Sequence, residues 1–172
     1  MSTQYLVTYA SRADSTAGVA EAIGKSMGKR GLRVDVMEMS AVKDLTPYSA
    51  VIAGSAIHGS QWLPEALHFV RANQPALRGK PFAAFLVCMT LAMPAGEKYR
   101  QHVSGFLQPV RQMVPTVSEG LFAGALDIQK IPSLADRLKF RVSVLLGVWK
   151  EGDHRDWEAI DRWAEELLQY IR

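Results

Sequence analysis

The sequence has a single cysteine, Cys88, among its 172 residues. A disulfide within the chain is therefore impossible, which fits a reducing compartment such as the cytoplasm. The four histidines are dispersed, so neither histidine nor cysteine clusters in the way a metal site needs, and we expect none. Cys88 lies in an apolar segment without a neighbouring base, so we expect a buried small hydrophobic residue rather than a nucleophile.

Long hydrophobic runs are also missing, and no run reaches the roughly 18 apolar residues that a membrane span needs. The N-terminal segment MSTQYLVTYA lacks the basic region and the apolar length of a signal peptide. Charge of neither sign dominates, since 20 Lys and Arg face 17 Asp and Glu for a net charge of +3. The basic residues are scattered without interleaved aromatics, which argues against nucleic-acid binding. We expect a cytoplasmic protein forming one domain over residues 1–172.

Two glycine-rich sequence motifs that bind nucleotide phosphates are absent. No G-x-G-x-x-G follows the first predicted strand, which disfavours a dinucleotide. The triplet GKS occurs at 24–26, but the phosphate loop of nucleoside triphosphatases requires a glycine where this chain has Val19. That triplet also lies inside a predicted helix, so we interpret it as helix surface.

Strand-like apolar runs alternate along the chain with segments of helical period. The predicted strands are 5–10, 32–39, 49–56, 81–89 and 119–127. The predicted helices are 15–30, 63–77, 95–114, 133–149 and 156–172, the last with Asp156 as N-cap. A short helix around 41–48 would complete the alternation. This order predicts a parallel sheet with helices on both faces, and ligands bind such sheets at the carboxyl ends of the strands.

Small and hydroxyl-bearing residues fill the loop after the first predicted strand, in the stretch LVTYASRADSTAG (6–18). Free N–H groups and the positive end of the following helix suit a phosphate there, with Ser11, Ser15 and Thr16 as added donors. The plainer alternative is that Ser15 or Thr16 only caps the helix. Asp14 would repel a phosphate unless its carboxylate points to solvent or accepts bonds from backbone amides.

The loops after two further strands have small residues that would let a flat ring approach the backbone. The first is GSAIHGSQWL (54–63), in which His58 or Trp62 would stack on a ring. For each of these two residues alone, a surface histidine and a core tryptophan are the favoured interpretations. The other is CMTLAMP (88–94), which would wall the opposite side of the ring.

Together these segments resemble the flavodoxin-like superfamily, and most closely the flavodoxin-domain family that includes menaquinone-dependent protoporphyrinogen oxidase. The resemblance spreads over nearly the full chain, in the segments 9–24, 50–70, 85–92 and 151–167. The last of these, EGDHRDWEAIDRWAEEL, is the most specific to this branch because an acidic-Gly-Asp-x-Arg-Asp-Trp pattern precedes the final helix.

The resemblance implies an α/β, flavodoxin-like three-layer sandwich with a five-stranded parallel sheet in the order 2-1-3-4-5 and FMN at the strand ends. The residues it implies around the FMN phosphate are Ser11, Arg12, Ala13, Asp14, Ser15 and Thr16. Those it implies on one side of the isoalloxazine ring are Ser55, Ala56, Ile57, His58 and Gly59, and those on the other side or at the pyrimidine edge are Thr90, Leu91 and Ala92. The segment GALD (124–127) ranks below these. Relatives commonly have glycine at position 14, but aspartate tolerates the left-handed backbone conformation better than most residues.

The function implied by this resemblance is an FMN-dependent oxidoreductase that passes electrons from a small organic donor, such as protoporphyrinogen IX, to a quinone. The alternatives are a flavodoxin-type electron carrier without its own substrate and a flavin-free binding domain. No catalytic acid or base stands out, and His58 is the best candidate for contact with the ring edge. Flavodoxins are acidic carriers, whereas this chain is basic, which favours a site near an anionic membrane surface.

The segment 133–150 mixes four cationic residues with leucine, valine, phenylalanine and tryptophan. A basic amphipathic helix of this kind either lies on a membrane or packs its apolar side on the sheet. Packing on the sheet is the favoured interpretation, and peripheral membrane contact through 133–150 is the alternative. A homodimer is left open, because nothing in the sequence specifies one.

Overall fold

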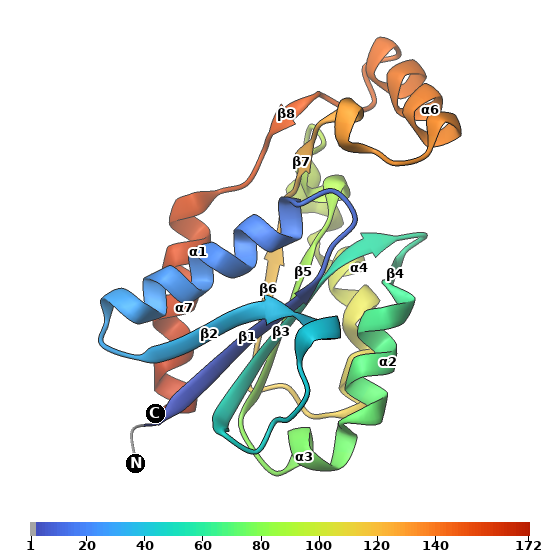
Figure 1. The fold of residues 1–172 in the computed structure, drawn as a ribbon. Coiled ribbons are helices and arrows are strands. Elements are labelled where there is room, and N and C mark those ends of the chain that lie inside the picture. Colours follow the sequence, from blue (N-terminus) through green and yellow to red (C-terminus); the bar gives the residue numbers. More distant parts are fainter. Residues whose placement is uncertain (1–2) are drawn as a thin grey trace.

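The computed structural model describes residues 3–172 and contains one parallel sheet between two helical layers (Figure 1). The parallel strands are β1 (Gln4–Ala10), β2 (Arg33–Glu38), β3 (Tyr48–His58), β5 (Phe82–Val87) and β6 (Ser118–Phe122). They are ordered β2-β1-β3-β5-β6, and the short β4 (Gln61–Trp62) pairs antiparallel with β3. Since β4 is only the return arm of a hairpin, the order of the five parallel strands confirms the predicted 2-1-3-4-5 sandwich.

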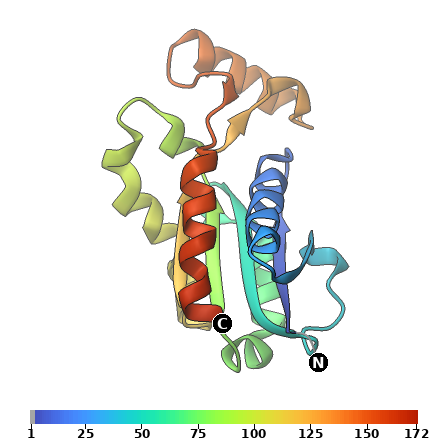
Figure 2. The same cartoon turned by 90° about the vertical axis from the view of Figure 1, so that its left-hand side faces the viewer.

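Helices cover both faces of the sheet (Figures 1 and 2). One face carries α1 (Ser15–Lys29) and α7 (Trp157–Ile171), which lie side by side. The helices of the opposite face are α2 (Pro64–Ala72), α3 (Gln74–Arg78), α4 (Arg100–Ser104) and α5 (Gln108–Met113). The 3-10 turns are η1 (Met39–Ala41), η2 (Met89–Ala92), η3 (Gly96–Tyr99), η4 (Gly105–Leu107) and η5 (Ile128–Lys130).

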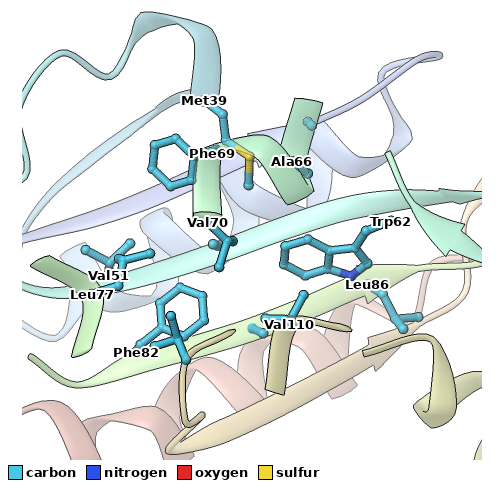
Figure 3. Close-up of a cluster of buried hydrophobic side chains, with 14 of the residues drawn as sticks. Met39, Val51, Trp62, Ala66, Phe69, Val70, Leu77, Phe82, Leu86 and Val110 are labelled. Carbon is cyan, nitrogen blue, oxygen red and sulfur yellow. The ribbon is translucent and has the colours of Figure 1, made fainter. Parts of the chain in front are cut away.

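Two hydrophobic cores hold these layers together, one on each side of the sheet. Side chains alternate between the faces of a strand, so Val7 packs toward α1 and α7 while its neighbour Leu6 packs toward α2 and α5. The second of these cores contains Trp62 and Phe69 (Figure 3). The central strands are buried on both faces, which explains their continuous apolar sequences.

The helix expected around 41–48 is wrong, because only the 3-10 turn η1 lies between β2 and β3. Asp44 accepts hydrogen bonds from the N–H of Thr46 at 2.8 Å and from its hydroxyl at 2.7 Å. Such local bonds compete with helix formation. Pro47 also disfavours a helical conformation at the residue before it, so the chain stays extended.

The helices predicted at 63–77 and 95–114 are each interrupted. The first is divided at Asn73, whose side-chain amide and backbone N–H both donate to the carbonyl of Phe69. Pro75 then stands in the first turn of α3, where its missing N–H costs nothing. The second contains η3, α4, η4 and α5, and Pro109 likewise stands in the first turn of α5.

The segment between β6 and α7 projects beyond the carboxyl ends of the strands. It contains β7 (Ala125–Leu126) and β8 (Gly152–Asp153), which pair antiparallel, and α6 (Leu134–Leu145). Both views show α6 standing apart from the two helical layers (Figures 1 and 2). None of its residues is buried, so the expectation that 133–150 packs on the sheet is wrong. The β7–β8 ladder carries this segment away from the sheet.

Helix α7 begins as expected, since the carboxylate of Asp156 accepts a hydrogen bond from the N–H of Ala159 at 2.9 Å. Over residues 3–172, no helix combines the length and the apolar character that crossing a membrane requires.

Candidate functional site

The loops singled out in the sequence all follow parallel strands, so they meet at one edge of the sheet. Residues 11–14 join β1 to α1, residues 58–61 form the turn between β3 and β4, and η2 follows β5. The structure thus brings the three predicted loops to the same end of the molecule (Figure 1).

The first loop turns into α1 through Asp14, which has φ 63° and ψ −11° in the left-handed region. This confirms the expectation that aspartate accepts the left-handed backbone conformation at this position. The carbonyl of Asp14 accepts from the N–H of Gly18 at 3.0 Å, and that of Ala13 accepts from Ser15 at 2.8 Å. The carboxylate of Asp14 is exposed and makes no capping hydrogen bond to the helix.

Two hydroxyl groups of this loop are buried without a hydrogen-bond partner within residues 3–172, namely Ser11 Oγ and Thr16 Oγ1. Thr16 is fully buried. The capping interpretation finds no support, because Asp14 holds the N-cap position and no side chain caps the helix. A buried hydroxyl without a partner is unfavourable by about 1–3 kcal/mol. An anion at the amino end of α1 would satisfy both hydroxyls together with the free N–H groups of the first turn, so this loop fits a phosphate.

Arg12 extends outward from the same loop. Its Nη2 lies 3.2 Å from Glu65 Oε2 in the first turn of α2. The two side chains are 59% and 47% exposed, so the pair contributes little to stability. The Arg12 side chain therefore lies at the outer side of the loop. It can leave Glu65 for another anion at a small cost in free energy.

The second loop is the two-residue turn of the β3–β4 hairpin. Gly59 and Ser60 have φ values of 58° and 61°, which matches the primed turns that join twisted strands. His58 and Gly59 are exposed at the tip, while Ala56 and Ile57 are half-buried. A flat ring would find the backbone of this tip accessible.

Two residues near this loop belong to the fold rather than to an open site. Ser55 is fully buried, and its hydroxyl donates to the carbonyl of Ala56 and accepts from the N–H of Leu63. Trp62 is 2% exposed and points into the core (Figure 3). The interpretation of Trp62 as a core residue and of His58 as a surface residue is confirmed.

The third loop is the 3-10 turn η2, in which Thr90, Leu91 and Ala92 are all partly exposed. Its path is fixed by Gly96, since a Cβ at that position would clash with the backbone of Leu91. Cys88, just before this turn, is 4% exposed, which confirms its expected burial.

Sequence reasoning gave no role to Arg155, which the structure places against the first loop. Its Nη1 donates to the carbonyl of Ser15 at 3.3 Å. The neighbouring His154 donates its backbone N–H to the carbonyl of Gly124 at 3.1 Å. A Cβ on Gly124 would lie 3.5 Å from Ser15 Oγ, so residue 124, ranked last among the predicted contacts, adjoins the loop. The motif EGDHRDW contains Arg155, but nothing in this short pattern indicates that the side chain contacts the first loop.

Two titratable groups near this edge have shifted pKa values. Burial raises the pKa of Tyr9, and the nearby carboxylates of Glu38, Glu21 and Asp14 raise it further. Hydrogen bonds from Arg155 lower the pKa of Asp153, so that this carboxylate stays ionised beside its partner. In the described part of the chain, no three His, Cys, Asp or Glu residues are grouped as a metal site would require.

A cavity of about 360 Å³ opens beside the third loop, between that loop and α7. Leu91, Phe122 and Trp163 supply apolar walls, and His154 is part of its rim. Charged side chains of both signs line the rest, so the cavity has no single electrostatic preference.

Comparison with known proteins agrees with this architecture. The family model described as Flavodoxin domain matches residues 6–149. A flavodoxin from the domain Archaea is similar over 96% of this chain and 99% of its own, with 20% identity and a TM-score of 0.55.

Two bacterial flavodoxins give similar results. Oxidised flavodoxin 2 from Bacillus cereus matches with 22% identity over 84% of this chain and 99% of its own, with a TM-score of 0.53. A flavodoxin from Streptococcus pneumonia matches with 19% identity over 97% of this chain and 99% of its own, with a TM-score of 0.60. No curated protein gives a significant match. Because the family model spans most of the chain and the strand order agrees with it, this protein belongs to the flavodoxin-domain family.

Proposed function

We propose that this protein binds FMN at the carboxyl edge of its sheet and transfers electrons through it. FMN is the cofactor of the flavodoxin fold to which the chain belongs. The observation that carries the proposal is the pair of buried, unpartnered hydroxyls on Ser11 and Thr16 at the amino end of α1. A phosphate is the ligand group that such a helix terminus accepts most readily.

The two ends of the cofactor would be held by different elements. Residues 11–16 would hold the phosphate with backbone N–H groups and hydroxyls. The ring would lie between the hairpin tip at Ile57–Gly59 and the turn Thr90–Ala92, which would orient it and exclude water from part of its surface. When bound, FMN supplies the electron-accepting chemistry, and the protein supplies position and surroundings.

The direct test is the visible absorbance spectrum and a fluorescence titration of the purified chain with FMN. We expect one FMN bound per chain, with quenched flavin fluorescence. A chain that binds neither added FMN nor riboflavin would contradict the proposal and favour the flavin-free binding domain.

A second candidate is an oxidoreductase with substrates of its own, an organic donor like protoporphyrinogen IX and a quinone acceptor. The observation that favours it is the exposure of large apolar side chains on α6, which projects beyond the carboxyl ends of the strands. Arg137, Lys139 and Arg141 lie on the same helix. A basic helix with exposed leucines suits peripheral contact with an anionic membrane, whose apolar interior holds the quinones.

Turnover separates the two candidates. The oxidoreductase would oxidise protoporphyrinogen with a menaquinone analogue as acceptor, two electrons and two protons passing to each quinone. An electron carrier would bind FMN equally well but would exchange electrons only with a protein partner. If the apolar face of α6 instead joins two copies in a homodimer, sedimentation will show association that depends on protein concentration.

A further inference from the structure

The segment that joins β8 to α7 lies against the first turn of α1, although Arg155 and Ser15 are 140 residues apart in the sequence. Arg155 makes the link through the hydrogen bond from Nη1 to the carbonyl of Ser15. Its side chain is only 17% exposed, which is low for an arginine near the surface.

The guanidinium of Arg155 is held from two further sides. Nε and Nη2 each donate to a different carboxylate oxygen of Asp153 at 2.8 Å, and the backbone N–H of Arg155 donates to the same carboxylate at 3.0 Å. The Cζ atom lies 4.4 Å from the centre of the Trp157 ring. A two-pronged carboxylate bond and a stacked ring fix the plane of a guanidinium, which a lysine ammonium would not reproduce.

The surface of α1 is shaped to receive this side chain. Gly18 lies one turn into the helix, and a Cβ at that position would clash with Nη1 of Arg155. On the other side, the hydrogen bond between His154 and Gly124 ties the same segment to the loop that adjoins Ser15 Oγ. The segment 152–157 therefore contacts the first turn of α1 directly through Arg155, and it contacts the loop at Gly124 through His154.

We propose that Arg155 is a positioning residue for the phosphate end of the cofactor site. It holds the first turn of α1, and therefore the N–H and hydroxyl groups of residues 11–16, in the geometry that a phosphate needs. Three of its five N–H groups have the partners described above. This inference rests on the proposed binding of FMN.

The test compares FMN with riboflavin, which has the same ring and no phosphate. Arg155→Ala should weaken FMN binding about tenfold or more, because the hydrogen bonds from residues 11–16 to a charged phosphate weaken when their donors lose their fixed positions, while riboflavin affinity changes less than about twofold. Arg155→Lys keeps the charge but not the fork and should recover only part of the loss. Arg71→Ala is the matched control, because Arg71 is an exposed arginine of α2, far from the loop.

The outcomes separate the two proposals. If the unchanged protein binds neither flavin, FMN binding itself is wrong, and this inference falls with it. If the unchanged protein binds FMN but Arg155→Ala binds it equally well, only the inference is overturned. Equal weakening of FMN and riboflavin would also overturn it, by assigning Arg155 to general stability. Should Arg155→Ala fail to fold, Asp153→Asn, which leaves the arginine in place but loosens it, must show the same selective loss.

Discussion

Gly18 and Arg155 fit together, since the space left by the missing Cβ of Gly18 is occupied by Nη1 of Arg155. Alanine is better than glycine inside a helix by about 1 kcal/mol, yet Gly18→Ala must displace the guanidinium. We expect Gly18→Ala to lower FMN affinity in the same way as Arg155→Ala. In the Arg155→Ala background the same change should add about 1 kcal/mol to the free energy of unfolding.

A double-mutant cycle measures this coupling through urea unfolding of the flavin-free protein. The control is Gly28→Ala in the same helix, because nothing lies within 4 Å of the added Cβ. That change should stabilise the chain equally in both backgrounds. If Gly18→Ala and Arg155→Ala are simply additive, the proposed fit between the two residues is wrong.

Asp14→Gly should leave FMN affinity unchanged or make it tighter. The left-handed backbone at φ 63° is freely available to glycine, and the substitution removes a negative charge beside the phosphate loop. The carboxylate makes no capping bond that would be lost. Fluorescence titrations at low and high salt measure the effect, which should shrink with salt because the charge is exposed.

Asp14→Asn is the control that separates charge from backbone conformation. Asparagine also tolerates the left-handed region, so it removes the charge without the conformational gain. A large loss of FMN affinity in either variant would show that the carboxylate makes a needed contact.

Much of the fold was predictable because local signals and global topology agree. The buried strands β3 and β5 are continuous apolar runs, and α7 carries both an N-cap aspartate and a regular apolar face. The helix expected at 41–48 does not form, because the hydrogen bonds that Thr46 donates to the Asp44 carboxylate and the restriction before Pro47 outweigh helical propensity.

The candidate site was predictable only where it is local. The loop of residues 11–16 is contiguous, so its composition indicates a phosphate site directly. The contact between Ser15 and Arg155 depends on how α7 packs beside α1, which no short pattern records. Ser55 was expected at the ring, but its hydroxyl bonds the residues around it instead. Whether the Ser55 hydroxyl faces the ring or bonds its neighbours depends on its burial, which the sequence of one strand does not reveal.

Thr16→Val tests the buried hydroxyl. Valine has nearly the same shape, so the flavin-free protein should keep its stability or gain some, since an unpartnered buried polar atom is removed. FMN affinity should fall about tenfold, and riboflavin affinity should not change. Thermal unfolding without flavin and titration with both flavins provide the measurements. A marked loss of stability without flavin would show that the hydroxyl has a structural partner.

Glu119 gives the protein a pH dependence unrelated to flavin. Hydrogen bonds from Arg111 lower the pKa of Glu119 below its ordinary value of 4.5, and Thr116 adds a smaller contribution. The stabilisation is therefore fully present above about pH 4.5 and is lost as the pH falls through the lower folded value. Glu119→Gln should lower the free energy of unfolding by about 1 kcal/mol at neutral pH and by progressively less in acid. Urea unfolding at a series of pH values measures this difference. Glu21→Gln is the control, because Glu21 is exposed, and it should change the free energy of unfolding little at neutral pH.

The exposed leucines of α6 allow binding to be altered without unfolding the protein. Leu138 and Leu145 are 65% and 86% exposed, so replacing both with glutamine should change the free energy of unfolding by less than about 0.5 kcal/mol. If α6 docks on an anionic membrane, flotation with vesicles containing anionic lipid should fall about tenfold or more, because each buried leucine contributes about 1.5–3 kcal/mol. Lys139→Gln with Arg141→Gln should weaken flotation mainly at low salt. Loss of self-association in place of flotation would assign this face to a homodimer, and a large drop in stability would show that α6 packs against the rest of the chain.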